Sequence, residues 1–390
     1  MIRPTAVTEA VSWRHELHRI PETAFAEHRT AAFIAEALEA LGVETVTGVG
    51  GTGAVGTLAR GGSDRIVGLR ADMDALPLTE RTGAPYASTH DRRMHACGHD
   101  GHMAMVLGAA AALARRDEEF DGTVRFVFQP AEEPGRGAAA MIDDGLFERF
   151  PMDALFGLHN IPGLPAGHLA TREGAIMAGE DNFAITITGR GGHASAPQRL
   201  TDPLVIGSEI VLALQSIVAR NVDPIAAAVV SCTGFTSDGA RNAVPSTVRI
   251  TGDTRNFAPS VSELLERRIV QLATGIAHAH DATAEIEYTR EFGTTVNHAD
   301  ATAAAAGAAR ALTSRFGTDS DSATPPIMAS EDFGVYGAHV PVNFTLIGNG
   351  TGNDVGSTPL HSHEYVFNDA VLPVGIAYYR ELVRQTLPCG

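Results

Sequence analysis

Side chains that can bind metal are concentrated in two short segments of the chain. The first, residues 94–102, reads MHACGHDGH and holds one cysteine, three histidines and one aspartate. The second, residues 129–134, reads QPAEEP and holds the adjacent carboxylates Glu132 and Glu133. Thiolate, imidazole and carboxylate groups bind borderline divalent cations such as zinc. A metal-assisted hydrolysis needs such ligands and a further carboxylate that takes a proton from water, so the two segments indicate a metallohydrolase.

Within the first segment, Cys97 and His99 form the strongest candidate pair. They flank a glycine, lie next to Asp100, and stand where a loop is expected to lead into a helix. A Cys-x-His sequence is not a complete metal motif, and a buried thiol beside a capping histidine is the alternative interpretation. His95 and His102 are better explained as structural or solvent-facing histidines. The pair Cys97 and His99 is therefore predicted to bind metal.

The adjacent carboxylates can take two different roles. Glu132 and Glu133 leave a strongly apolar segment, and Pro130 and Pro134 restrict the backbone on either side. Neighbouring residues of an extended chain point in opposite directions, so one carboxylate can bind metal while the other faces a substrate. The spacing does not decide which residue has which role, and a solvated pair at the end of a strand is the alternative.

Further histidines extend the candidate site. His159 closes an apolar segment, where a buried structural histidine is as good an interpretation as a metal ligand. His361 lies close to the end of the chain after a glycine-rich stretch, and His363 competes with it as a ligand. The spacing alone leaves that choice open.

Composition limits the classes of partner and the compartment. The 390 residues are too many for one hydrophobic core, so two domains are expected. The net charge of −17 argues against nucleic acid or an anionic membrane as partner. Cys97, Cys232 and Cys389 are far apart and odd in number, which is typical of a reducing compartment. The amino terminus lacks the apolar core of a signal peptide and no uninterrupted apolar run is long enough to span a membrane, so a cytoplasmic location is expected.

Alternating strands and helices predict an α/β domain with a largely parallel sheet. The expected strands are 65–70, 124–128, 154–158 and 342–347, and the expected helices are 8–18, 27–41, 103–115, 138–144, 301–316 and one from about residue 369. Ligands of open sheets bind beyond the carboxyl ends of the strands. Polar residues follow three of the expected strands there: Asp72 and Asp74, then Glu132 and Glu133, then His159.

A second domain is expected as an insertion. The pattern from residue 182 to 292 predicts strands at 183–188, 226–232, 247–254 and 284–288 and helices at 202–220 and 260–278. This βαββαβ order is typical of a ferredoxin-like fold. The first domain is then formed by residues 1–181 and 293–390. In the insertion, His193 lies in a glycine-rich turn that can be a simple hairpin, and Asn242 and Arg255 have ordinary surface interpretations.

Taken in chain order, a series of motifs resembles the M20 metallopeptidase family, in particular its amidohydrolase branch. That branch includes hippurate hydrolases, N-acyl-amino-acid amidohydrolases and plant auxin-conjugate hydrolases. The motifs cover nearly the whole chain: 18–22 (HRIPE), 70–77 (RADMDALP), the segment 94–102, 129–133 (QPAEE), 157–159 (GLH), 191–193 (GGH), 328–333 (MASEDF) and 360–362 (LHS).

The resemblance implies a large mixed-sheet αβα metallohydrolase domain with an inserted ferredoxin-like domain that acts as a lid or dimerisation domain. It implies two divalent metal ions per subunit and a homodimer or homotetramer. The implied ligands are Cys97, whose sulfur bridges the ions, together with His99, Glu133, His159 and His361.

The resemblance also implies roles for residues that bind no metal. Glu132 matches the general base, and Asp74 is expected to support the ligands. In the inserted domain, His193 and Asn242 match residues that meet the substrate, and Arg255 matches a position associated with the substrate carboxylate. Two departures from the family pattern concern substrate preference. His363 follows Leu-His-Ser at the position where the family often has proline, and Gln198 stands where a histidine is common.

The expected activity is hydrolysis of the amide bond of an N-acyl amino acid, which releases a carboxylic acid and a free amino acid. A thiolate with imidazoles favours zinc, cobalt or nickel, and the carboxylate also admits manganese. The alternatives are a dipeptidase or aminopeptidase that uses the same site, a thiol amidase with Cys97 as nucleophile and His99 as base, and a non-catalytic binding protein. An unliganded base at Glu132 argues against the last of these.

Overall fold

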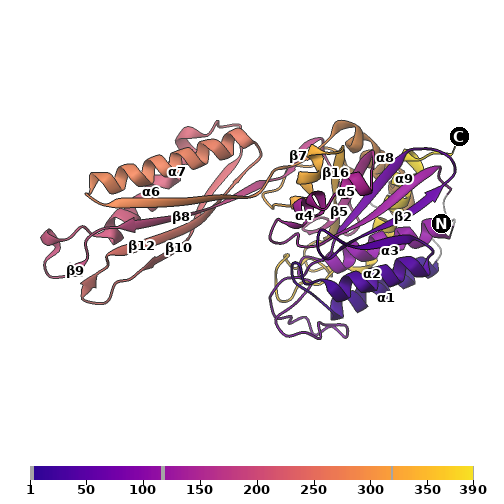
Figure 1. The fold of residues 1–390 in the computed structure, drawn as a ribbon, viewed down its shortest axis with the longest axis horizontal. Coiled ribbons are helices and arrows are strands. Elements are labelled where there is room, and N and C mark those ends of the chain that lie inside the picture. The colour runs from indigo at the N-terminus through magenta and orange to yellow at the C-terminus, as the bar shows by residue number, and fades with distance from the viewer. Residues whose placement is uncertain (1–3, 116–118, 318, 390) are drawn as a thin grey trace. The chain divides into compact units, whose positions relative to one another are not determined.

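The computed structural model describes residues 4–115, 119–317 and 319–389, which form two compact units. The large unit comprises Met1–Ile176, Thr295–Pro326 and Asp332–Gly390, and the inserted unit comprises Met177–Thr294 and Ile327–Glu331 (Figure 1). The sequence places the insertion at 182–292 and assigns nothing from 327–331 to it. That short segment belongs to the inserted unit because the backbone N–H of Ala178 donates to the carbonyl oxygens of Ile327 and Ala329.

The large unit is built on a mixed sheet. Among its described residues, eight strands lie in the order β1-β2-β4-β3-β5-β16-β6-β15. Their bounds are β1 Glu44–Val49, β2 Gly53–Arg60, β3 Ile66–Asp72, β4 Gly122–Gln129, β5 Ala154–Pro162, β6 Leu169–Ala170, β15 Ser320–Asp321 and β16 Val342–Gly350. Strands β4, β3, β5 and β16 run parallel, whereas β1 and β2 are antiparallel additions at one edge. Strands β7 (Gly174–Met177) and β14 (Thr295–Asn297) form a separate two-stranded sheet.

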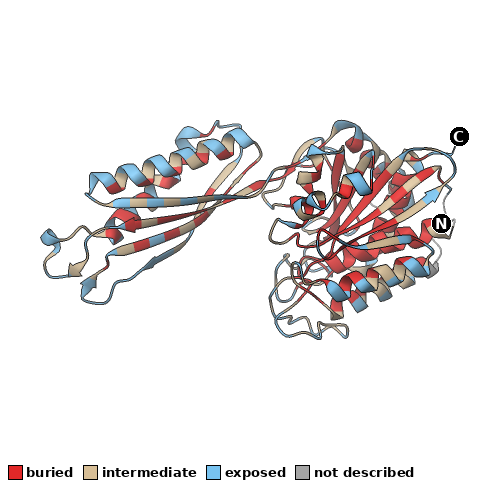
Figure 2. Ribbon diagram, in the orientation of Figure 1, coloured by how far each residue is buried: buried red, intermediate tan, exposed pale blue. Residues whose placement is uncertain are grey.

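Helices surround this sheet. Their bounds are α1 Pro4–Arg19, α2 His28–Ala40, α3 His99–Ala114, α4 Gly137–Asp143, α5 Leu146–Arg149, α8 Ala299–Phe316 and α9 Leu372–Thr386, with 3₁₀ turns η2 Asp332–Ala338 and η3 Asp369–Val371. Helix α3 is buried from His99 to Leu113 and contacts α1, α9 and β3, which explains its many alanines (Figure 2). An all-round buried helix needs small side chains to fit between its neighbours.

The predicted mixed α/β architecture is confirmed, although several short elements were not predicted, among them β6, β7, β14 and β15. The hairpin β1–β2 was not predicted, because glycines at 48, 50, 51, 53 and 56 interrupt its apolar pattern. Helix α3 begins at His99, four residues earlier than the apolar pattern suggests. The chain enters it through Gly98, whose φ of +91° is a conformation that favours glycine.

The inserted unit has the order β8-α6-β10-β12-α7-β13. The bounds are β8 Gly179–Thr188, α6 Pro203–Asn221, β10 Ala228–Ser237, β12 Thr247–Asn256, α7 Pro259–Ala279 and β13 Thr283–Phe292. The sheet order is β10-β12-β8-β13, all antiparallel, and a core of aliphatic side chains joins the sheet to both helices. A small ribbon of β9 (Gly192–His193) and β11 (Ala243–Val244) stands apart from this sheet, and η1 (Pro197–Arg199) follows β9.

Helix α6 is long and apolar enough to cross a bilayer on length and composition alone, although the sequence showed no uninterrupted apolar run of that length. Ile206, Ile210, Leu214 and Ile217 of α6 are buried in the aliphatic core of the inserted unit. A helix that covers a sheet has this same one-sided pattern, so the composition of α6 is explained by packing.

Candidate metal centre and active site

The candidate ligands in the large unit come from the ends of parallel strands and from the start of α3. Asp72 ends β3, Glu132 and Glu133 follow β4, and His159 lies on β5. Because β4, β3 and β5 are parallel neighbours, their carboxyl ends meet at one edge of the sheet. Helix α3 brings His99 to the same place.

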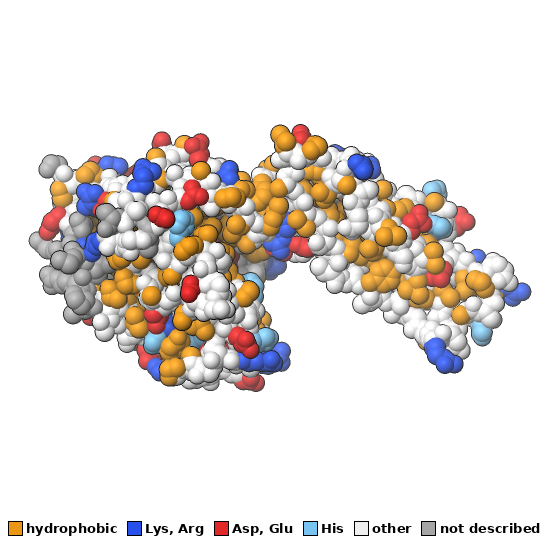
Figure 3. All heavy atoms as spheres, turned by 180° about the vertical axis from the view of Figure 1, so that it is seen from behind, with side chains coloured by type: hydrophobic (Ala, Val, Ile, Leu, Met, Phe, Trp, Pro, Cys, Tyr) orange, Lys and Arg blue, Asp and Glu red, His pale blue; other side chains and the backbone are white. Residues whose placement is uncertain are grey.

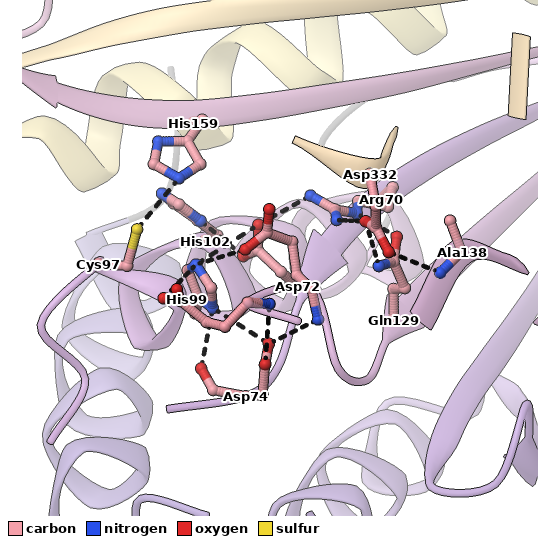
Figure 4. A network of polar contacts seen from close by, with 12 residues as sticks. Arg70, Asp72, Asp74, Cys97, His99, His102, Gln129, Ala138, His159 and Asp332 are labelled. Atoms are coloured by element: carbon pink, nitrogen blue, oxygen red, sulfur yellow. Dashed lines mark hydrogen bonds and ion pairs between the residues drawn. The ribbon is translucent and has the colours of Figure 1, made fainter. Parts of the chain in front are cut away.

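The predicted ligands converge there, and Figure 4 shows Cys97, His99 and His159 among them. Cys97 Sγ lies 3.5 Å from His159 Nε2, and His361 Nε2 lies 3.6 Å from Glu133 Oε2. Ligand atoms of Cys97, His99 and Glu133 all lie within 4.8 Å of one another. The separations of 3.5 and 3.6 Å are those expected of atoms that share a cation, since two ligands at about 2.0–2.3 Å from zinc are separated by roughly 3–4 Å.

Hydrogen bonds fix the tautomers of two histidines in the form that binds metal. His99 Nδ1 donates to the carbonyl oxygen of Asp74 at 2.8 Å, and His159 Nδ1 donates to that of Asn160 at 2.6 Å. Both rings therefore turn an Nε2 lone pair toward the cluster. Among the described residues His99 Nε2 has no hydrogen-bond partner, although it is fully buried and carboxylate oxygens of Glu132 and Glu133 lie 3.9 Å away. A divalent cation satisfies that nitrogen and those oxygens together, so the residues fit such a group.

The buried groups of the cluster change one another's pKa values. Burial raises the pKa of the Cys97 thiol well above its usual range, and the nearby Glu133 raises it further. Burial disfavours a charged His99, but Asp72 and Cys97 outweigh this effect and raise the pKa of His99. Burial lowers the pKa of His159. Without an added positive charge a thiolate at Cys97 is therefore strongly disfavoured beside these carboxylates.

Asp74 holds the two adjacent carboxylates in place, as expected of a supporting residue. Its Oδ1 accepts from the backbone N–H of Glu132 at 3.0 Å, and its Oδ2 accepts from that of Glu133 at 3.1 Å. The backbone turns just before them at Ala131, which has a φ of +49° and is fully buried. Glu133 belongs to the ligand group with Cys97 and His99, whereas Glu132 does not.

The two C-terminal histidines have different surroundings. The backbone N–H of His361 donates to the carbonyl oxygen of Ala96, which ties it to the segment that carries Cys97. His361 adopts a φ of +63°, a conformation that costs a residue with a side chain about 1 kcal/mol or more. His363 instead donates through Nδ1 to the carbonyl oxygen of Thr79 at 2.6 Å. The geometry thus brings His361 to Glu133 and directs His363 elsewhere.

A second group of possible ligands, Asp72, His99, His102 and His159, lies beside the first. Two of its members already have their polar atoms engaged. His102 Nδ1 donates to Asp72 Oδ1 at 2.7 Å, and the other oxygen of Asp72 accepts from Arg70 at 2.7 Å. His102 and Asp72 are therefore less available to a cation than the members of the first group.

Sequence reasoning missed most of this supporting network. Arg70 Nε donates to Gln129 Oε1 at 2.9 Å, and Gln129 Nε2 donates to Asp332 Oδ1 at 2.7 Å. Asp332 Oδ2 in turn accepts from the backbone N–H of Ala138 at 2.9 Å (Figure 4). A charged residue inside an apolar strand, as Arg70 is in β3, was the available signal, because buried charge must be paired.

A separate buried network of charged side chains contacts the first turn of α3. Asp100 Oδ2 accepts from Arg14 at 3.0 Å and from His18 Nδ1 at 2.8 Å, and His18 Nε2 lies 3.3 Å from Glu80 Oε2. Burial opposes a charged His18, but Asp100 and Glu80 outweigh it and raise the pKa of His18 to about 9. This network fastens α1 to the helix that carries His99.

His193 and Asn242 lie together in the inserted unit. Strand β9 pairs with β11, and the carbonyl oxygen of Asn242 accepts from the backbone N–H of Ala194 at 3.1 Å. His193 Nδ1 accepts from the backbone N–H of Ser195 at 3.1 Å. A neutral His193 therefore carries its proton on Nε2, which makes that nitrogen a hydrogen-bond donor.

Arg255 already has carboxylate partners within the inserted unit. Its Nε donates to Asp253 Oδ2 at 2.7 Å, and its Nη1 lies 2.8 Å from Glu180 Oε2. Nη1 also donates to Ser330 Oγ at 2.7 Å. A substrate carboxylate bound through these nitrogens must replace one of these partners.

Comparison with known proteins gives a consistent result. The model of the peptidase family M20/M25/M40 matches residues 68–385. A hippurate hydrolase of Campylobacter jejuni is 41% identical over 375 residues, which is 96% of this chain and 95% of the relative. IAA-amino acid hydrolase ILR1-like 5 of Arabidopsis thaliana is 36% identical over 381 residues, or 97% of this chain and 86% of the relative.

A solved structure agrees with these relatives. The crystal structure of a dinuclear metal-binding peptidase of the M20 family from Bacillus subtilis matches with a TM-score of 0.83 and 31% identity. The match covers 98% of this chain and 99% of the other. The chain belongs to the peptidase family M20/M25/M40.

Proposed function

We propose that the protein is a metal-dependent amidohydrolase that cleaves N-acyl amino acids to a carboxylic acid and a free amino acid. One observation carries the proposal: two carboxylates, Glu132 and Glu133, lie equally far from His99 Nε2, at 3.9 Å, and only Glu133 belongs to the ligand group. We assign the role of the base to Glu132, which lies next to Glu133 in the chain and equally close to His99. Relatives named hippurate hydrolase, IAA-amino acid hydrolase and N-acetylcysteine deacetylase support this substrate class.

The proposed ligands are Cys97, His99, Glu133, His159 and His361. When bound, two divalent ions lower the pKa of a water molecule and polarise the amide carbonyl. Glu132 takes the proton from the attacking water and delivers it to the amide nitrogen as the carbon–nitrogen bond breaks, because an amine leaves poorly as an anion. His193 donates through Nε2 to the oxygen that becomes negative, and Asn242 contacts the substrate beside it.

We propose zinc as the native metal, with manganese, cobalt or nickel as alternatives. The donor set supports this order, since the Cys97 thiolate and the three imidazoles are soft or borderline ligands. A carboxylate at Glu133 is compatible with all four ions.

The thiol amidase alternative conflicts with the surroundings of Cys97. A nucleophilic cysteine needs a lowered pKa and access to solvent. Burial and Glu133 instead raise the pKa of Cys97, and the residue is only 7% exposed.

Activity on a panel of substrates tests the proposal. The metal-free protein is reconstituted with zinc or manganese and assayed with N-acetyl, N-benzoyl and longer N-acyl amino acids, with dipeptides as the comparison class. We expect hydrolysis of N-acyl amino acids that a chelator abolishes and added metal restores. Activity that survives the chelator and is lost on alkylation would support the thiol amidase, and cleavage of dipeptides alone would refute the N-acyl amino acid assignment.

We further propose a cytoplasmic homodimer or homotetramer that binds neither nucleic acid nor membrane. Strand β10 lies at an edge of the inserted sheet, and this unit exposes Leu212 and Ile225 by 74% and 94%. Figure 3 shows apolar side chains grouped on its surface. Exposed edges and apolar side chains of this kind are usually covered by another chain. Cys97, Cys232 and Cys389 are free thiols, which supports a reducing compartment.

A further inference from the structure

His102 is a buried histidine that takes no part in the proposed reaction. It lies on α3, one turn after His99, and is 1% exposed. Its Nε2 lies 2.9 Å from the backbone nitrogen of Asn160 and 3.0 Å from Asn160 Nδ2. Because the backbone N–H can only donate, Nε2 must accept, and the ring proton must be on Nδ1, where Asp72 accepts it at 2.7 Å. The ring is therefore neutral and held in one tautomer.

Asn160 connects His102 to two of the proposed ligands. It directly follows His159, and its own carbonyl oxygen accepts from His159 Nδ1 at 2.6 Å. Its side chain is fully buried: Nδ2 donates to the carbonyl oxygen of Cys97 at 2.6 Å, and Oδ1 accepts from the Tyr365 hydroxyl at 2.7 Å. The close approach requires glycine at position 98, because a Cβ there would lie 2.3 Å from Asn160 Nδ2.

Asp72 anchors His102 from the other side. Its second carboxylate oxygen accepts from Arg70, which also binds Gln129 through Nε (Figure 4). All of these side chains are at most 2% exposed. A fully paired buried network of this kind cannot shift one member without leaving another polar group unsatisfied.

We infer that His102 is a positioning residue that, through Asn160, sets the spacing between Cys97 and His159. His102 Nε2 accepts from the side-chain amide of Asn160 and so orients it, and this amide donates to the backbone carbonyl oxygen of Cys97. His102 Nε2 also accepts from the backbone N–H of Asn160, which fixes the strand next to His159. The two ligand atoms, Cys97 Sγ and His159 Nε2, thereby stand 3.5 Å apart. Loss of the acceptor leaves two buried N–H groups unsatisfied and releases this constraint. The inference rests on the proposed metal ligands.

Metal affinity of three variants tests the inference. His102→Asn keeps a donor near Asp72 but has no group that reaches Asn160, whereas His102→Gln places an amide oxygen near the former Nε2. His95→Asn is the matched control: His95 is also 1% exposed, lies two residues from Cys97, and makes no hydrogen bond through its ring among the described residues. Zinc dissociation constants are measured by chelator competition, and the absorption of the cobalt-substituted protein reports the contact between cobalt and the Cys97 thiolate.

We expect His102→Asn to weaken the binding of at least one zinc ion by about 10–100-fold, the usual effect of losing a group that orients a ligand. The thiolate-to-cobalt band should shift, and His102→Gln should restore much of the affinity and the band. Unchanged affinity in His102→Asn, or an equal loss in His95→Asn, would overturn the inference. If His102→Asn does not fold, Tyr365→Phe takes its place: it removes one hydroxyl from Asn160 and should weaken zinc binding in the same direction, and unchanged affinity would count against the inference.

These measurements separate the inference from the proposed function. Zinc affinity and the cobalt spectrum do not depend on which amide the enzyme hydrolyses, so a failed substrate panel leaves them intact. Wild-type protein that binds no metal would instead refute the proposed metal site itself.

Discussion

At the scale of single residues, the function depends on two neighbours with the same side chain and different surroundings. The backbone N–H groups of Glu132 and Glu133 both donate a hydrogen bond to the Asp74 carboxylate, which fixes the turn on which they lie. Only Glu133 approaches His361, at 3.6 Å. The two side chains are chemically identical, so the roles that we propose for them rest on the path of the backbone.

Substitution of each glutamate by glutamine separates those roles. Glu132→Gln keeps the shape but removes the base, so turnover should fall by about two to four orders of magnitude while bound metal is retained. Glu133→Gln should lower metal content, because an amide is a weaker ligand than a carboxylate. Metal analysis and steady-state kinetics on both variants check this. The opposite pair of phenotypes would mean that the assignment is reversed.

The choice of thiol and histidine ligands can be examined by metal analysis alone. Cys97→Ser should lose at least one of two ions per chain, because a buried serine does not supply the negative charge of a thiolate. His363→Ala is the matched control for His361→Ala: the first should retain both ions and the second should not, since His363 faces Thr79. Full metal content in Cys97→Ser would refute the bridging sulfur.

Residue types and spacing predicted Cys97 and His99 as ligands, whereas the choice of Glu133, His159 and His361 came from the resemblance to the M20 family. The supporting residues could not be predicted in this way. Gln129 and Asp332 are 203 residues apart in the chain, and their contact depends on the whole large unit having folded. His102 was interpreted as a spare histidine because nothing near it in sequence reveals that Asn160 is its partner.

At the scale of elements, the position of α3 determines the position of His99. The apolar pattern predicts the body of this helix but not its first turn, because the polar His99 and Asp100 interrupt the pattern. That turn is joined to α1 because His18 Nδ1 of α1 donates to Asp100 Oδ2 at 2.8 Å. An ion pair between buried side chains therefore joins the two helices where the apolar packing of α3 ends.

The stability that His18 provides should depend on pH. Its pKa is raised to about 9 in the folded protein, against about 6.5 when unfolded, so the folded state binds the proton more tightly. The contribution is fully present below about pH 6.5 and is lost as pH rises through 9. His18→Gln should thus lower the free energy of unfolding by about 3 kcal/mol at pH 6 and by much less above pH 9.

Urea unfolding at pH 6, 7.5 and 9.5 in the presence of a chelator measures this difference without a contribution from metal binding. His280→Gln serves as control, because His280 forms an exposed pair with Glu209 at 2.9 Å, and such pairs contribute little. A difference between wild type and His18→Gln that stays constant from pH 6 to 9.5 would contradict the assignment.

At the scale of the whole molecule, His193 and the proposed metal ligands belong to different units. A domain insertion was predictable because the pattern of strands and helices changes near residue 181 and resumes near 293. The structure groups the segment 327–331 with the inserted unit, and no local pattern in the sequence indicates this because the contact is made through hydrogen bonds to Ala178.

Mixing two inactive variants tests whether one subunit completes the site of another. If it does, a hybrid of Glu132→Gln and His193→Ala subunits has one complete site. Random exchange should then restore about a quarter of wild-type turnover, because half of the dimers are hybrids and each hybrid has one complete site out of two. Mixing Glu132→Gln with the Glu132→Gln/His193→Ala double variant should restore nothing. Absence of recovery despite demonstrated subunit exchange would place His193 in the site of its own chain.

The way in which the inserted unit begins and ends also has a consequence for folding kinetics. Its first and last strands are neighbours, with Glu180 of β8 opposite Phe292 of β13. If this unit folds first, the two parts of the large unit are separated by only a few flexible residues rather than by the whole of 177–294. The free-energy cost of closing the loop, which is entropic, then falls by about 3 kcal/mol. A substitution that destabilises only the inserted unit should therefore slow the assembly of a metal site to which that unit contributes no ligand.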